Sequence, residues 1–236
     1  MSPAPRWSEV TALFGGAFDP PHLGHRAAVA GLFERPGIKK VLVLPTPSPK
    51  YKPCVASVPD RVEMTKLCFG ADWADSGFPA SEVAINLCEV ERAQKNVGAL
   101  TYTFDTLSTL RSQFPKLAFC LGADQLTSMD TWYQFPEVLK LSHWIVLARK
   151  PDGIEIAHNA LKRWEQAGIA KKYEGGWQIT GSGTWLEIFE TPARSLSSTQ
   201  IREALGRTGV APQDTLLESV SRYLMDHALY GTRKPL

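Results

Sequence analysis

Residues 13–25 read LFGGAFDPPHLGH, and this stretch decides the fold. The apolar run from Val10 to Phe14 predicts a buried strand, which two glycines end at once. The prolines at 20 and 21 predict a stiff turn, because proline fixes φ and lacks an amide donor. The alanine-rich pattern from Gly24 to Phe33 then predicts a helix. A strand therefore leads through a glycine-rich turn into a helix.

Two imidazoles lie at the start of this helix, three residues apart. The spacing places His22 and His25 on roughly one side of the helix start. The unpaired amides and the positive end of the helix dipole lie at the same place. The stretch therefore predicts an anion site, and phosphate is the anion that such a site favours.

The rest of the chain alternates strand and helix patterns. Strands are predicted near 39–45, 83–87, 117–121, 144–148 and 185–190, and helices near 60–69, from 101 or 103 onward, 154–167 and 216–229. Thr101 and Thr103 are candidate caps of the helix that starts there. This order predicts an α/β fold with a doubly wound (Rossmann-like) parallel sheet and a C-terminal helical segment. The glycine turn matches neither the dinucleotide-binding pattern nor the P-loop.

Length and composition fit one globular domain. The chain has 236 residues, 44% of them apolar, and a net charge of +2. We expect a single domain over 1–236 with a core near 10–150 and 185–206. A peripheral insertion is expected near 152–183 and C-terminal helices near 197–230.

The charge pattern and the cysteine content limit the binding partners and the cellular compartment that we expect. Charges of both signs are interspersed, so neither nucleic-acid nor membrane binding is expected. The first residues lack a signal-peptide core, and no apolar run would span a membrane. The four cysteines show no CxxC pairing and are read as reduced and mostly buried, which indicates the cytoplasm.

Polar groups follow several of the predicted strands, at the sheet edge where ligands bind in open α/β folds. The proline-rich loop 45–53 contains Lys50 and Lys52, which either reach an anionic ligand or are surface lysines. Asp124 follows a strand and would either bind a ligand or cap a helix. Trp132 would be either a ring platform or part of the core. Asp19 is interpreted as a turn residue rather than a catalyst.

A second polar motif, SSTQIR at 197–202, lies where a late helix begins. By itself a run of hydroxyls is more often a helix cap than a phosphate clamp. Together with two histidines and Arg202, it offers donors to a polyphosphate and no obvious nucleophile. A zinc site would need further ligands, and the other histidines, at 143, 158 and 227, have no ligand-like spacing. The set suits direct in-line attack of one phosphate on another, with pyrophosphate leaving.

The two motifs together resemble those of a known superfamily. GG-x-FDP-x-H-x-GH followed late in the chain by SST-x-x-R resembles the nucleotidyltransferases with the HxGH signature. The proline loop, the YT-x-x-TL stretch at 102–107, the GAD at 122–124 and the WY at 132–133 narrow the resemblance to bacterial nicotinate-mononucleotide adenylyltransferase. Arg149-x-Pro151 and the closing Leu229-Tyr230 extend it. The match runs from Leu13 to Tyr230 and is weakest over 152–183.

The resemblance implies a reaction and a set of roles. Such enzymes transfer AMP from ATP to nicotinate mononucleotide, forming deamido-NAD and pyrophosphate in NAD biosynthesis. Mg²⁺ is then bound through the ATP phosphates, and no side chain is expected to ligate a metal. The implied catalytic residues are His22, His25 and Arg202. The implied ATP site comprises Gly15, Gly16, Phe18, Lys52, Gly122, Asp124, Ser198 and Thr199, and the implied acceptor site comprises Thr103, Trp132, Tyr133 and Arg149.

Trp132 would stack on the pyridine ring, and backbone amides near Thr103 and Tyr133 would receive the nicotinate carboxylate. Donors without an opposing acceptor favour a carboxylate over an amide. The chain departs from the family where a histidine usually follows the prolines, because Tyr51 stands there. A phenol donates a hydrogen bond but cannot become cationic near neutral pH, so Lys50 would supply the missing charge. Tyr51 is therefore not expected to be a ligand, whereas Lys52 is.

Alternative acceptors are nicotinamide mononucleotide, phosphopantetheine and FMN. A non-catalytic nucleotide-binding sensor is a further alternative, which the two intact motifs disfavour. The sequence leaves open whether the protein is a homo-oligomer.

Overall fold

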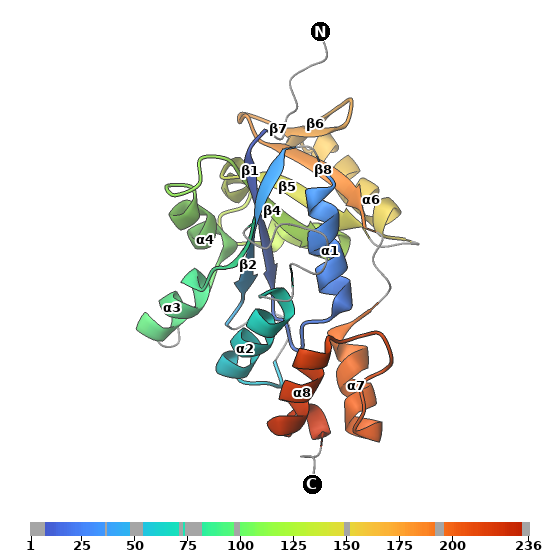
Figure 1. Cartoon of the computed structure of the whole chain (residues 1–236). Helices are drawn as coiled ribbons and strands as arrows, with labels where there is room; N and C mark the ends of the chain where they lie inside the picture. Colours follow the sequence, from blue (N-terminus) through green and yellow to red (C-terminus); the bar gives the residue numbers. More distant parts are fainter. Residues whose placement is uncertain are drawn as a thin grey trace. The chain divides into compact units, whose positions relative to one another are not determined.

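The predicted alternation of strands and helices is present in the computed structural model (Figure 1). It describes residues 8–35, 37–47, 54–70, 73, 82–96, 100–148, 152–191 and 196–232. The chain forms two units, each assembled from three segments. The first unit comprises Met1–Gly15, Gly31–Val41 and Tyr102–Pro192, and the second comprises Gly16–Ala30, Leu42–Thr101 and Ala193–Leu236.

The strands are β1 (Val10–Gly16), β2 (Ile38–Pro45), β3 (Val83–Ile85), β4 (Leu117–Gly122), β5 (His143–Ala148), β6 (Ala170–Tyr173), β7 (Gly176–Ile179) and β8 (Trp185–Glu190). The helices are α1 (Leu23–Phe33), α2 (Val58–Phe69), α3 (Cys88–Lys95), α4 (Thr103–Leu110), α5 (Ala123–Thr127), α6 (Gly153–Gln166), α7 (Ser198–Thr208) and α8 (Glu218–Asp226). Short 3₁₀ helices are η3 (Met129–Thr131), η4 (Glu137–Lys140) and η5 (Leu229–Gly231).

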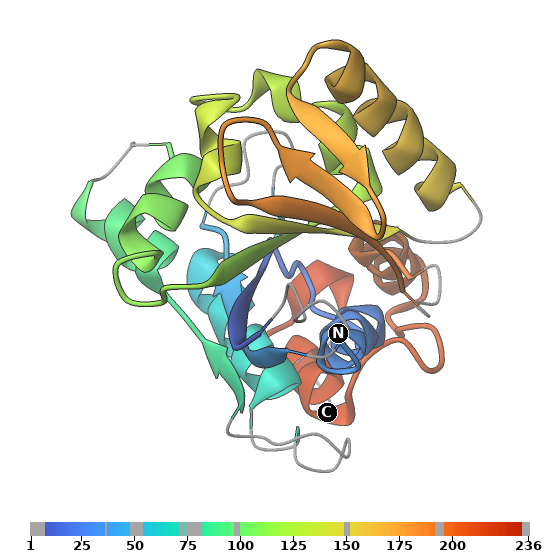
Figure 2. The same cartoon turned by 90° about the horizontal axis from the view of Figure 1, so that it is seen from above.

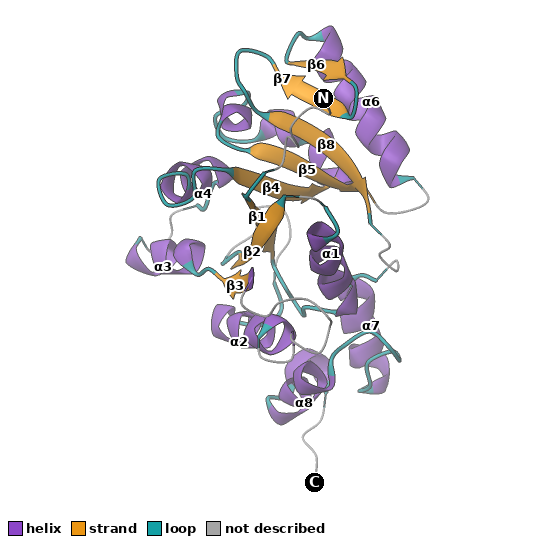
Figure 3. Cartoon of the chain, turned by 45° about the horizontal axis from the view of Figure 1, so that its top comes forward, coloured by secondary structure: helices purple, strands orange, loops and turns teal. Residues whose placement is uncertain are grey.

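The sheet is mostly parallel, as predicted. The strand order is β3-β2-β1-β4-β5-β8-β7-β6, and β1 and β2 each have residues in both units. In the first unit β1, β4, β5 and β8 pair in parallel (Figure 3). One row of paired, buried residues crosses these strands: Leu13, Phe119, Trp144 and Leu186. Burial on both faces explains why these strands are continuous apolar runs.

The sheet ends in an antiparallel hairpin that the sequence pattern does not predict. β6 pairs with β7, and β7 with β8, in antiparallel register. This hairpin and α6 make up most of residues 152–183, and α6 lies beside the hairpin (Figure 2). α6 buries Ala157, Leu161 and Trp164, a helical spacing that forms one apolar stripe.

The second unit contains most of the other helices. α2 begins at a proline-containing turn capped by Ser57, whose hydroxyl accepts from the amide of Asp60. α7 is capped by Ser197, which accepts from the amide of Thr199, and ends at Gly209 with a φ of +73°. The left-handed conformation at residue 209 suits glycine, which has no Cβ.

Some boundaries differ from the predictions. The first residue before α4 is Tyr102, with no side-chain cap, so neither Thr101 nor Thr103 caps it. α8 is shorter than predicted because Ala228 has a φ of +50°, which a right-handed helix does not allow. α3 was not predicted at all, and Asp124 does not cap α5, because Gly122 occupies that position.

None of the four cysteines, all of which lie among the described residues, forms a disulfide. Cys68 and Cys120 are buried, whereas Cys54 and Cys88 are partly exposed. Burial raises the pKa of the Cys68 thiol to about 12. Within the described residues, no helix is both long and apolar enough to cross a membrane.

Candidate active site

The two motif histidines form a stacked pair at the start of α1. Their ring centroids are 3.7 Å apart and the planes are inclined by 23°. The His22 amide donates to the Nδ1 of His25 at 3.2 Å, and the His25 amide donates to the Nδ1 of His22 at 3.3 Å. His22 is 3% exposed, and His25 is half-buried.

These reciprocal hydrogen bonds define the tautomer of both rings. A ring nitrogen that accepts a hydrogen bond carries no proton, so the proton of each neutral ring lies on Nε2. Both imidazoles are therefore Nε2–H donors, a form suited to phosphate oxygens. The start of α1 lies in the same place and adds the positive end of the helix dipole. Contrary to the sequence prediction, its amides are not all unpaired, because the Leu23 amide donates to the Thr215 carbonyl and the His25 amide also donates to the His22 carbonyl, at 2.8 and 2.9 Å.

Neighbouring residues hold the pair in position. The Phe18 ring meets the His25 ring edge-on at 5.2 Å, and Phe18 is buried with a φ of +50°. The Leu23 amide donates to the carbonyl of Thr215 at 2.8 Å. A Cβ on Gly24 would lie 3.0 Å from Nδ1 of His22, which explains the glycine of the motif.

The second motif lies against the turn that precedes the histidines. Ser198 donates from its hydroxyl to the carbonyl of Pro20 at 2.9 Å. Arg202 donates from Nη1 to the carbonyl of Asp19 at 2.6 Å, and its Nη2 lies 3.4 Å from the Thr199 hydroxyl. The structure thus brings together Ser198, Thr199 and Arg202 with the turn over residues 17–22, here called the histidine turn, all within the second unit.

The Asp19 carboxylate is buried and has four donors around it. Oδ2 accepts from the amide of Val55 at 2.9 Å and lies 3.6 Å from Nη1 of Arg202. Oδ1 accepts from the amide of Ala56 at 3.0 Å and from the hydroxyl of Tyr230 at 2.7 Å. Asp19 is therefore a turn residue, as predicted, and also the point where three distant segments meet.

Arg61 was not singled out from the sequence. It is 1% exposed, and its guanidinium donates to the carbonyls of Ala17, Thr46 and Pro47 at 2.6 to 2.7 Å. Arg61 thereby joins the histidine turn to the chain that leaves β2. A buried arginine is uncommon, and a local pattern does not reveal distant carbonyl partners.

The predicted acceptor residues lie in the first unit. Thr103 is the first residue of α4, where amides have no intrahelical partner. The ring of Tyr102 stacks on that of Tyr133 at 4.5 Å, and Phe104 meets Tyr133 edge-on at 5.9 Å. The structure thus brings the start of α4 together with Tyr133.

Trp132 is half-buried at the edge of the first unit's core. Its ring meets those of Phe119 and Trp144 at 6.4 and 6.5 Å. Trp144, by contrast, is fully buried, and its indole donates to the carbonyl of Leu139 at 3.0 Å. Trp132 therefore has an anchored ring with part of its surface accessible.

The remaining predicted residues lie at strand ends or outside the described residues. Gly122 ends β4, and Asp124 is exposed in the first turn of α5. Gly15 and Gly16 end β1, and a Cβ on Gly16 would lie 3.0 Å from the Phe18 ring. Lys50, Tyr51, Lys52 and Arg149 lie outside the described residues.

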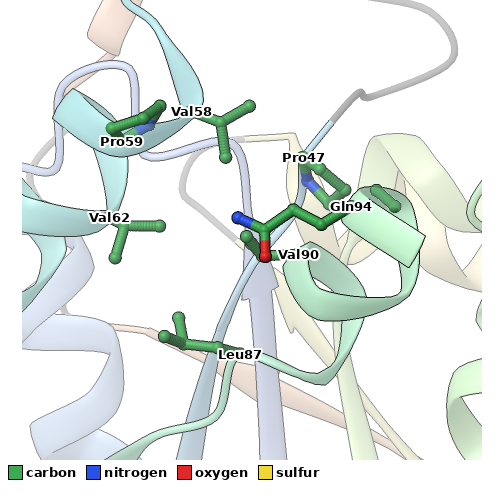
Figure 4. A pocket seen from close by; sticks show the side chains of 8 residues that line it. Pro47, Val58, Pro59, Val62, Leu87, Val90 and Gln94 are labelled. Carbon is green, nitrogen blue, oxygen red and sulfur yellow. The ribbon is translucent and has the colours of Figure 1, made fainter. Parts of the chain in front are cut away.

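An apolar cavity of about 470 Å³ lies in the second unit between α2 and α3 (Figure 4). Its lining residues are Pro47, Val58, Pro59, Val62, Leu87, Val90, Ala93 and Gln94. None of these is charged, so this cavity does not suit a polyphosphate.

The described residues contain no cluster of three or more His, Cys, Asp or Glu side chains that could hold a metal ion. The buried Asp19 carboxylate is already engaged by amides, a hydroxyl and a guanidinium. A divalent cation would therefore fit this site as a companion of the ATP phosphates rather than as an ion held by a carboxylate cage.

Comparison with known proteins shows which family the chain belongs to. The model of the cytidylyltransferase-like family matches residues 13–204, which include both motifs. The chain belongs to the cytidylyltransferase-like family. It is accordingly a nucleotidyltransferase, as predicted from the two motifs.

Relatives within this family agree with the narrower resemblance. A nicotinate-nucleotide adenylyltransferase from Neisseria meningitidis serogroup B is 31% identical over 221 residues, covering 92% of this chain and 96% of the relative. One from Salmonella arizonae is 32% identical over 223 residues, covering 93% and 97%. These matches confirm the family predicted from the sequence motifs.

A solved structure has the same fold. The nicotinic acid mononucleotide adenylyltransferase of Plasmodium falciparum, complexed with NaAD, superposes with a TM-score of 0.71 at 16% identity. The match covers 96% of this chain and 100% of that one. The α/β fold with a mostly parallel sheet is therefore shared by this cytidylyltransferase-like protein.

Proposed function

We propose that this protein transfers the adenylyl group of ATP to nicotinate mononucleotide, forming deamido-NAD and pyrophosphate in NAD biosynthesis. The observation that carries the proposal is the stacked histidine pair, whose tautomers place an Nε2–H on each ring beside the start of α1. The names of the Neisseria and Salmonella relatives support the choice of acceptor.

The reaction is a direct displacement at phosphorus. A phosphate oxygen of nicotinate mononucleotide attacks the α-phosphorus of ATP, and a new P–O–P linkage forms. The bond from the α-phosphorus to the oxygen that bridges to the β-phosphate breaks, and pyrophosphate leaves with that electron pair. No protein nucleophile is required, so the chain contributes positioning and charge stabilisation.

His25 is the donor to the α-phosphate, because it is the more exposed of the two histidines. Charge grows on this phosphate's oxygens in the transition state, and a fixed N–H donor stabilises it. His22 supports His25 through the reciprocal hydrogen bond and donates to the neighbouring phosphates.

The start of α7 completes the phosphate site. Thr199 and Arg202 lie beside the histidine turn, and Arg202 offers several N–H donors to the leaving β- and γ-phosphates. Mg²⁺ bound to the ATP phosphates supplies further neutralisation of their charge. In the first unit, Gly15, Gly122 and Asp124 are proposed to contact the adenosine, because they lie near the carboxyl ends of β1 and β4. In the second unit, Gly16 and Phe18 are proposed as further adenosine contacts.

The acceptor site is assigned to the aromatic residues of the first unit. Trp132 offers an anchored ring for the pyridine, and the first-turn amide of Thr103 suits a carboxylate. The ring of Tyr133 stacks on that of Tyr102 and so holds the backbone near Tyr133 beside the start of α4. An amide of this segment is proposed as the second donor to the carboxylate. Outside the described residues, Arg149 is proposed as a further cationic contact to the acceptor, and Lys52 as one to ATP.

The experiment is an end-point assay with defined products. The purified protein is incubated with ATP, Mg²⁺ and nicotinate mononucleotide, and deamido-NAD and pyrophosphate are quantified by chromatography. Equal amounts of both products are expected. ATP consumption without deamido-NAD, or no consumption at all, would contradict the proposal.

A further inference from the structure

Tyr230 lies near the C-terminus and contacts the histidine turn through one hydrogen bond. Its hydroxyl donates to Oδ1 of Asp19 at 2.7 Å, and the two residues are 9% and 3% exposed. Burial, together with this hydrogen bond, raises the pKa of Tyr230 well above its ordinary value. The hydroxyl therefore keeps its proton near neutral pH and donates a hydrogen bond to the buried carboxylate.

The backbone that presents Tyr230 has an uncommon conformation. Ala228 and Tyr230 have φ values of +50° and +54°, and Gly231 has +84°. Left-handed non-glycine residues are rare, and they persist where the surrounding structure requires them. Here the turn buries an aromatic ring and orients its hydroxyl.

Two contacts fix this turn. A Cβ on Gly231 would lie 3.3 Å from the Cα of Gly206 in α7, so the two backbones approach closely. The Thr232 hydroxyl lies 2.7 and 2.8 Å from the carbonyls of Leu224 and Leu229. The turn is thus attached to α7, the helix that also provides Ser198 and Arg202.

The Asp19 carboxylate links the turn that carries Tyr230 to the histidine turn. Asp19 stands three residues before His22, and its own carbonyl is held by Arg202. Its side chain is held by Tyr230 and by the amides of Val55 and Ala56, just after the proline-rich loop. A change at the Tyr230 hydroxyl therefore alters the support of the turn from which His22 and His25 project.

We propose that Tyr230 is a positioning residue that holds the histidine turn through the Asp19 carboxylate, an inference that rests on the adenylyl-transfer function proposed above. Tyr230 does not touch the substrate. Its hydroxyl fixes Asp19, and Asp19 fixes the placement of the histidines against the α-phosphate. A misplaced hydrogen-bond donor loses more of its stabilisation of the transition state than of its stabilisation of the ground state.

Tyr230→Phe tests this with the loss of one oxygen atom. We expect kcat to fall about 10-fold, while KM for ATP changes less than about 2-fold. The matched control is Tyr223→Phe, because the Tyr223 hydroxyl also donates to an aspartate, Asp60, at 3.0 Å in the same unit. The control should keep the kcat of the unmodified protein. Thermal unfolding confirms that each variant is folded at the assay temperature.

A double-mutant cycle tests whether the effect passes through Asp19. Asp19→Asn replaces the carboxylate by an amide, which has only one accepting oxygen, so we expect kcat to fall. If Tyr230 acts through Asp19, adding Tyr230→Phe to this variant should lower kcat no further. If Asp19→Asn does not fold, Thr232→Val tests instead whether the turn acts through the Tyr230 hydroxyl, because this variant loosens the turn that carries Tyr230. The effect of Thr232→Val on kcat should vanish in the Tyr230→Phe background.

Three results would overturn the inference: an unchanged kcat in folded Tyr230→Phe, an equal loss in Tyr223→Phe, or independent effects in the cycle. The unmodified protein distinguishes this failure from that of the proposed function. If it forms no deamido-NAD, the proposed function itself is wrong. If it does, and Tyr230→Phe is equally active, only the positioning role is wrong.

Discussion

The backbone amide of His22 donates to the ring of His25, and the backbone amide of His25 donates to the ring of His22. Each ring thus accepts at Nδ1 and keeps its proton at Nε2. The arrangement converts two side chains into a pre-set pair of N–H donors. It also means that neither histidine can be altered without disturbing the hydrogen bonding of the other.

His25→Ala tests the catalytic role of the pair. We expect kcat to fall by about 10² to 10⁴-fold, because a preorganised donor to the reacting phosphate is lost. His227→Ala is the control, since His227 lies at the end of α8 and stacks on Tyr223. Steady-state kinetics and thermal unfolding are measured on both variants. A His25→Ala enzyme with unchanged turnover would remove His25 from the mechanism.

Gly24→Ala tests the packing around His22. The added Cβ would lie 3.0 Å from Nδ1 of His22 and 3.3 Å from Cβ of Leu196, so the imidazole has to shift. We expect a loss of kcat, about 10-fold or more, because a small displacement of a catalytic group is costly. Gly183→Ala, where the Cβ meets no atom within 4 Å, should leave kcat unchanged. Equal kcat in both variants would contradict the account.

Trp132→Ala and Trp144→Ala separate binding from stability. Trp132 is half-buried, and its loss should raise KM for nicotinate mononucleotide about 10-fold through lost stacking. Trp144 is fully buried, and its loss should lower the free energy of unfolding by about 3 to 5 kcal/mol. Acceptor titrations and urea unfolding measure the two effects. An unchanged KM in Trp132→Ala would reject the ring platform.

His143 gives the protein a pH-dependent stability. Burial lowers the pKa of His143 below its ordinary value of 6.5, although Glu187 opposes this shift. The unfolded chain therefore binds a proton at a higher pH than the folded one, and stability falls as the pH drops through about 6.5. His143→Asn keeps an acceptor for the Trp185 amide but does not titrate.

Urea unfolding at pH 7.5 and pH 5.5 measures this contribution. The free energy of unfolding should drop more in the unmodified protein than in His143→Asn. An identical drop in both proteins would assign the pH dependence to other groups.

Elements with a strong apolar pattern were predictable from the sequence. β4 and β5 are buried along almost their whole length, so they read as continuous apolar runs. α3 buries only Glu89 and Val90 and therefore lacks an apolar stripe. β6 is exposed at three of its four residues, so it shows no alternation, and its antiparallel pairing could not be predicted.

Some residues of the candidate site could also be predicted from the sequence, and others could not. The histidines and the Ser198–Arg202 cluster could be predicted as site residues because each motif is local in the sequence. The partners of Asp19 come from residues 55, 56, 202 and 230, and the three acceptors of Arg61 from residues 17, 46 and 47. Such long-range hydrogen bonds leave no local pattern, so these supports appear only in the structure.

The central claim concerns the acceptor, and relative kcat/KM values test it most directly. Pyrophosphate release is measured with ATP, Mg²⁺ and each of nicotinate mononucleotide, nicotinamide mononucleotide, phosphopantetheine and FMN. The account predicts the highest kcat/KM with nicotinate mononucleotide, because helix-start amides favour its carboxylate over a carboxamide. A higher kcat/KM with any of the other three acceptors would contradict it.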